Sequence, residues 1–245
     1  MSQQKLTTLK SAWIELSEKY IMALRELSTS YCWGARICAT LVLSIAAWAT
    51  GVSWLGGYPE WTTLGGGAAM VPYSMMSFLL VGLGIMAASF HIQGVTPYQY
   101  TEGFKAGMSI MLLASSSTVG VDLLFHTTTI TGLGLGASNE AWQQDSAQYG
   151  SPSVAAVMAF LLLAIVGILH FRSLWRVLFS WTVVGIGGLG LLGNAPGIGW
   201  PYFYIPGVFT GMAWLTAGLL VLSGTCYLLM TKHWNGLGVP NFPVP

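Results

Sequence analysis

The stretch AGMSIMLLASSSTVGVDLLFH, residues 106–126, contains a single residue of the types Asp, Glu, Lys and Arg, which is Asp122. At a rise of 1.5 Å per residue, a helix of this length extends about 30 Å, which is the thickness of the hydrocarbon core of a bilayer. The stretch therefore predicts a transmembrane helix. Composition agrees, since 54% of the 245 residues are hydrophobic and 7% are charged, whereas soluble proteins average about 25% charged.

Five further apolar runs of similar length predict five more spans, at about 37–56, 71–90, 153–171, 174–193 and 206–230. Pro72, Pro152 and Pro206 stand at or near the first turns of three spans, where a missing N–H costs little. We therefore expect an all-α integral membrane protein with six transmembrane helices, arranged as three helical hairpins in a domain at 37–230.

The basic residues predict an orientation for these spans. If the N-terminus is cytoplasmic, every Lys and Arg falls on the cytoplasmic side, as the positive-inside rule requires: Lys5, Lys10, Lys19, Arg25, Arg36, Lys105, Arg172, Arg176 and Lys232. We expect a bacterial inner-membrane protein with both termini in the cytoplasm and a tail at 231–245.

An apolar stripe precedes the first span. Apolar residues recur there at spacings of three and four, which is typical of an amphipathic helix: Leu6, Leu9, Trp13, Leu16, Tyr20, Ala23 and Leu27. We expect residues 1–36 to form a cytoplasmic amphipathic helix that lies on the membrane, packs on another subunit or forms a short coiled coil.

A short motif closes three of the predicted helices and indicates an internal repeat. It reads GVSWL at 51–55, GVDLL at 120–124 and GLGLL at 188–192, each followed by a loop and a helix. The middle loop, 127–152, is the longest. Insertions in repeat proteins commonly fall on the binding face, so this loop is a candidate site.

Residues Met70–Gly82, MVPYSMMSFLLVG, resemble the M-x-P-x-(S/T)-A-x-x-F-L-L-x-G signature of bacterial multi-helix membrane sensor modules. Those modules precede PAS, histidine kinase or diguanylate cyclase domains, and Met75 replaces the usual alanine. The likeness covers about 37–230. It implies either a sensor region without its transmitter, since only a short tail follows Lys232, or a stand-alone relative that binds other membrane subunits.

The candidate ligand-binding residues are Asp122, His126 and Trp142. Asp122 lies about 24 Å along its span, near the outer edge, and His126 follows one turn later on the same side. The pair is either a hydrogen-bonded helix end or a site for a proton or small ligand. Trp142 is in the long middle loop.

Other classes of function find less support in the sequence. The near-neutral charge argues against nucleic acid, and neither Cys32, Cys38 and Cys226 nor any histidine shows metal-site spacing. His91 and His170 lie too near the membrane rim to predict a haem, so we name no cofactor. We expect a non-catalytic module that binds a ligand or other membrane subunits. An accessory or scaffold subunit of a respiratory or photosynthetic complex is the alternative, and a small transporter the third.

Overall fold

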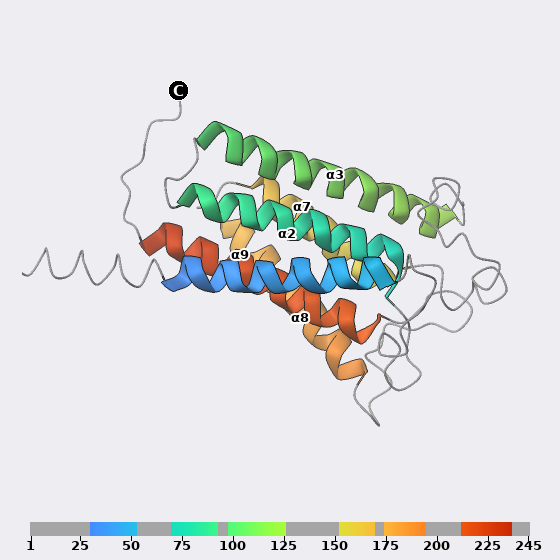
Figure 1. Ribbon diagram of the computed structural model, residues 1–245. Coiled ribbons are helices and arrows are strands. Elements are labelled where there is room, and N and C mark those ends of the chain that lie inside the picture. The colour runs from blue at the N-terminus through green and yellow to red at the C-terminus, as the bar shows by residue number, and fades with distance from the viewer. Residues whose placement is uncertain are drawn as a thin grey trace, which may run out of the picture.

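A computed structural model describes residues 30–52, 70–92, 98–125, 152–169, 174–194 and 212–236. Six helices make up nearly all of these residues. The first is Ser30–Val52, drawn in blue in Figure 1. The others are α2 (Pro72–Ile92), α3 (Tyr98–Phe125), α7 (Val154–Ile168), α8 (Leu174–Gly193) and α9 (Trp214–Gly236). The described part of the chain is thus all-helical.

Four of the helices are long and apolar enough to cross a membrane, at Ser30–Val52, Glu102–Val121, Leu174–Gly193 and Trp214–Thr231. The apolar parts of α2 and α7 are shorter, at Tyr73–Ser89 and Val154–Ile168. The helical membrane character expected from the sequence is therefore confirmed.

Local signals place several helix ends. Pro72 is the first residue of α2, as the sequence predicts. The Ser153 hydroxyl caps α7 by accepting a hydrogen bond from the Ala156 N–H at 3.2 Å, which satisfies one of the donors left free at a helix start. The bounds of α8 coincide with the predicted 174–193.

Several predicted boundaries differ from the structure. The α3 helix begins at Tyr98 and not near 106. The last helix begins at Trp214 and not near 206. Met212 and Ala213 before it are not helical, and the Met212 carbonyl accepts a hydrogen bond from Asn194 Nδ2 at 3.0 Å. The predicted boundary at 36/37 falls inside the Ser30–Val52 helix, which runs through it without a break. Residues 1–29 lie outside the described residues.

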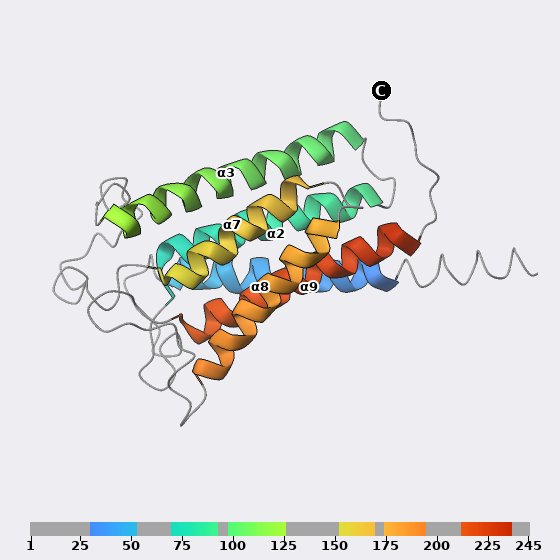
Figure 2. The ribbon, with the colours of Figure 1, turned by 180° about the vertical axis from the view of Figure 1, so that it is seen from behind.

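The helices pack as a bundle in which α7 contacts α2, α3, α8 and α9 (Figures 1 and 2). The α8 and α9 helices lie side by side, and α3 packs on α2 and α7. The Ser30–Val52 helix lies against α2 and α9, because Leu43 is close to Gly82 and Leu229 is close to Gly34. The aromatic core joins α2 to α7, since Phe160 meets Tyr73 and Phe78 edge-on at 5.6 and 4.9 Å.

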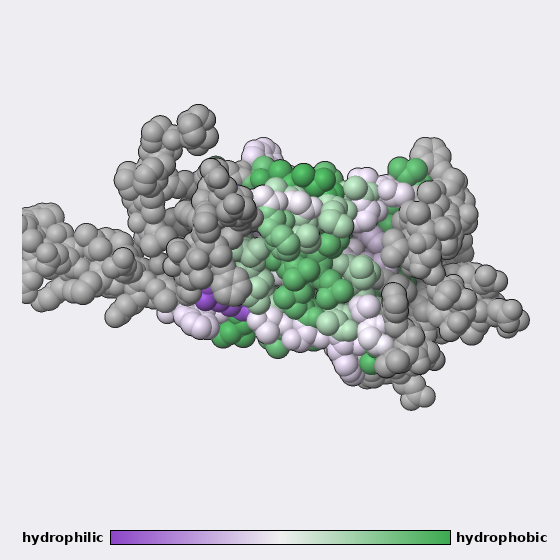
Figure 3. Space-filling view, turned by 45° about the horizontal axis from the view of Figure 1, so that its top comes forward, coloured by the Kyte–Doolittle hydropathy of each residue, from purple (hydrophilic) through white to green (hydrophobic). Residues whose placement is uncertain are grey.

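Bulky apolar side chains also cover the outside of this bundle, and small polar side chains are buried among the apolar ones inside it. Ile37, Ile110 and Trp181 are each more than half exposed, whereas Ser116 and Ser180 are fully buried. Figure 3 shows a broad hydrophobic area over the middle of one face. In a soluble protein, contiguous apolar areas on the surface are small. An extensive apolar exterior is what a bilayer requires, and buried serines can hydrogen-bond between membrane helices.

Helix glycines allow close packing at some positions only. A Cβ at Gly187 or Gly190 would lie within 3.0 Å of α9 atoms, and a Cβ at Gly82 would lie 2.6 Å from Leu43 Cγ. Gly185 and Gly188 face open space instead. The difference follows from helix geometry, because residues two apart point about 200° apart around the axis.

Candidate functional site

The three residues predicted to bind a ligand are only partly covered by the structure. Asp122 lies in the last turn of α3, as expected for a helix end, and its side chain is not among the described ones. His126 and Trp142 lie outside the described residues. The prediction that these three residues form a site at that end of α3 stays a prediction.

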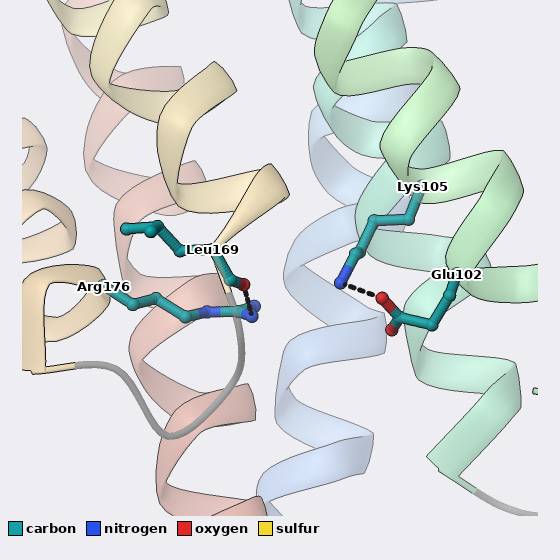
Figure 4. Close-up of polar contacts among 4 residues, drawn as sticks. All are labelled: Glu102, Lys105, Leu169 and Arg176. Carbon is teal, nitrogen blue, oxygen red and sulfur yellow. Dashed lines mark hydrogen bonds and ion pairs between the residues drawn. The ribbon is translucent and has the colours of Figure 1, made fainter. Parts of the chain in front are cut away.

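A different group of polar residues converges at the opposite end of α3. Lys105 on α3 and Arg176 on α8 are 2% and 0% exposed, although each is charged. With Glu102 on α3 and Tyr227 on α9, they form what we call the charged cluster. Figure 4 shows the Arg176 guanidinium and the Lys105 ammonium pointing toward one another from the two helices.

Lys105 and Glu102 form the ion pair of this cluster. Lys105 Nζ lies 2.7 Å from Glu102 Oε2, and the residues are one helical turn apart. The Glu102 side chain is 25% exposed, so the pair reaches from the interior to the surface of the bundle. The second carboxylate oxygen, Oε1, is buried and accepts no hydrogen bond from the described residues.

Arg176 joins three helices. Its Nη1 donates to the Leu169 carbonyl at the end of α7, at 3.4 Å, and its guanidinium carbon lies 5.1 Å from the ring centre of Tyr227. Arg176 also interacts electrostatically with Glu102 and Lys105. A planar guanidinium suits this position because it hydrogen-bonds in its plane and stacks on an aromatic ring with its face.

A close contact at Gly167 brings α7 against this cluster. A Cβ at Gly167 would collide with Ser109 Oγ on α3 and would lie 3.2 Å from Tyr227 Oη on α9. Glycine is therefore the residue that lets α7 fit between its two neighbours at this level. The close approach fixes the end of α7, which presents the Leu169 carbonyl to Arg176.

A second basic residue lies toward the same end of the bundle but in a different environment. Arg36 Nη2 and Nε donate to the Ser89 carbonyl and hydroxyl at 2.9 and 3.2 Å, which ties the Ser30–Val52 helix to the end of α2. Its guanidinium also lies over the Trp33 ring at 5.5 Å. Arg36 thus joins two helices.

Sequence reasoning missed the charged cluster because it treated Lys105 and Arg176 as cations that only set the orientation of the spans. The pairing of Glu102 with Lys105 one turn later was a visible signal. Among the described residues, no group of three or more His, Cys, Asp or Glu side chains is placed to hold a metal ion.

No protein-family model, curated protein or solved structure matches the chain.

Proposed function

We propose that this protein is a non-catalytic membrane module, of sensory type or descent, that acts by binding a ligand or other membrane subunits. In this proposal six helices cross the bacterial inner membrane as three hairpins, with both termini in the cytoplasm. Residues 1–36 contribute an amphipathic helix at the cytoplasmic face.

The observation that carries the proposal is the charged cluster. Burying a charged side chain costs several kcal/mol, and a buried ion pair is weak evidence for stability. Charged residues inside membrane helices are instead candidates for function. Lys105 and Arg176 come from helices far apart in the sequence, and their charged groups point toward one another (Figure 4). Such a group can bind a partner, and it can stabilise one arrangement of the helices over another. A receptor or sensor module needs both properties.

The α3 helix connects the charged cluster with the predicted Asp122 site. The 20 residues from Glu102 to Asp122 span about 30 Å of helix. A ligand or subunit bound near Asp122 would thus act on the same rigid element that carries Glu102 and Lys105. This gives the module one binding end and one responding end.

The test compares Asp122→Asn with Ser117→Ala, a change of an exposed side chain on the same helix. The whole chain is solubilised gently, and native mass spectrometry shows which small molecules or subunits stay bound. We expect Asp122→Asn to lose a species that wild type and Ser117→Ala retain, while the unfolding temperature stays unchanged.

Two results would contradict parts of this proposal. If the wild-type protein carries no bound small molecule or subunit in any preparation, the proposed binding function is wrong. A retained pigment or cytochrome, detected by its visible absorbance, would favour the alternative, an accessory subunit of a respiratory or photosynthetic complex.

A further inference from the structure

We propose that the charged cluster binds the phosphate group of an anionic phospholipid through Lys105 and Arg176. This inference rests on the proposed function, since it names a ligand class for a module that acts by binding. Three observations carry it: the sign of the charge, the burial of the two cations and the position of the cluster along the helices.

The charge of the cluster favours an anion. Glu102 carries one negative charge against two positive charges on Lys105 and Arg176. The two cations interact with each other, and their repulsion is weakly screened because both side chains are buried. A phosphate oxygen between them would favour both cations at once, and charge-assisted hydrogen bonds of this kind are the strong ones.

The position of the cluster selects a lipid as the source of the phosphate. Lys105 lies three residues into the apolar segment that begins at Glu102, and Arg176 lies two residues after the start of the one that begins at Leu174. At 1.5 Å per residue, both lie within about 5 Å of the ends of these segments. Phospholipid phosphates lie at that boundary, and basic sites between transmembrane helices bind their headgroups.

Glu102 supplies a mechanism of exchange. Its Oε2 forms an ion pair with Lys105 Nζ at 2.7 Å. Because the Glu102 side chain is partly exposed, a phosphate group can approach this ion pair from the surface of the bundle. A phosphate entering there competes with the carboxylate for the same ammonium group. Glu102 therefore lowers the affinity for phosphate while Lys105 and Arg176 raise it.

The test is specific because substitutions of the neighbouring residues Lys105 and Glu102 should change lipid binding in opposite directions. The full chain is delipidated in a mild detergent and titrated with phosphatidylglycerol or phosphatidylcholine, with binding read by native mass spectrometry. We expect wild type to prefer phosphatidylglycerol. Lys105→Gln should weaken that binding about tenfold, and Glu102→Gln should strengthen it several-fold.

Arg36→Gln is the matched control, because Arg36 is also basic and lies toward the same end of the bundle, but is bonded to Ser89. We expect Arg36→Gln to change the affinity for phosphatidylglycerol by less than about twofold. Arg176→Gln should behave like Lys105→Gln. If Arg176→Gln does not fold, the opposite shifts of Lys105→Gln and Glu102→Gln still decide the question.

Equal binding of the two lipids by wild type, or weaker binding by Glu102→Gln, would overturn the inference. A parallel titration with inorganic phosphate separates the sources. Phosphate binding with the same dependence on Lys105, and no preference between lipids, would keep phosphate recognition and remove the lipid. Failure of this inference leaves the Asp122-dependent retention intact, so the two proposals fail separately.

Discussion

Replacing Gly187 by alanine tests the packing of α8 on α9. The new Cβ would lie 2.7 Å from the Ala217 carbonyl oxygen and 3.0 Å from the Val221 nitrogen. Both atoms belong to the backbone of α9, so no side-chain rotation can relieve the contact. Ordinary contact begins at 3.4 Å, and the two helices must therefore separate locally by about 0.7 Å.

The size of the effect follows from two opposing terms. Overpacking a tight interface costs about 1–3 kcal/mol, whereas a change from glycine to alanine within a helix gains up to about 1 kcal/mol. Gly185→Ala has only the gain in helix stability, because nothing lies within 4 Å of a Cβ at that position. The difference between the two variants therefore isolates the steric cost, about 1–3 kcal/mol.

The assay is the free energy of unfolding in detergent, followed by circular dichroism, for wild type, Gly187→Ala and Gly185→Ala. We expect Gly187→Ala to be less stable than Gly185→Ala by that difference and Gly185→Ala to equal or exceed wild type. Equal stability of the two variants would refute the close contact of α8 with α9.

Two further predictions concern buried hydrogen bonds. Tyr73→Phe removes the 2.6 Å hydrogen bond with Ser116 and should lower the free energy of unfolding by about 1–3 kcal/mol, because the buried Ser116 hydroxyl loses its partner. In the same unfolding assay, adding Ser116→Ala should recover part of this loss, whereas additive losses would contradict the pairing. Asn194→Ala removes the hydrogen bonds to the Gly190 and Met212 carbonyls at 2.7 and 3.0 Å and should lower the free energy of unfolding by about 1–2 kcal/mol. Amide hydrogen exchange at the start of α9 should become faster, and unchanged exchange there would contradict this role of Asn194.

The positions of the helices were predictable because they depend on local properties of the chain. Length and apolarity locate α8 to the residue, and Pro72 marks the first residue of α2. The start of α9 was not predictable in this way. Its position depends on the contact between Asn194 and the Met212 carbonyl, which joins residues that only the fold brings together.

The charged cluster lay beyond sequence reasoning for a similar reason. Basic residues near the end of an apolar segment normally extend toward water, and the local signal, a glutamate three residues before Lys105, does not reveal that the lysine is buried. Its burial results from the packing of α7 between α3 and α8, which brings Arg176 close although it is 71 residues away. The binding role of Asp122, by contrast, was predicted from sequence alone and stays a prediction.

The glycines of α8 and α9 face each other in both directions. Gly187 and Gly190 of α8 receive atoms of α9, while Gly224 of α9 lies against Val184 and the Ser180 carbonyl of α8. With the backbones close on both sides, turning or sliding one helix past the other would bring their atoms into collision. We therefore expect α8 and α9 to act as one unit, which also holds Tyr227 beside Arg176.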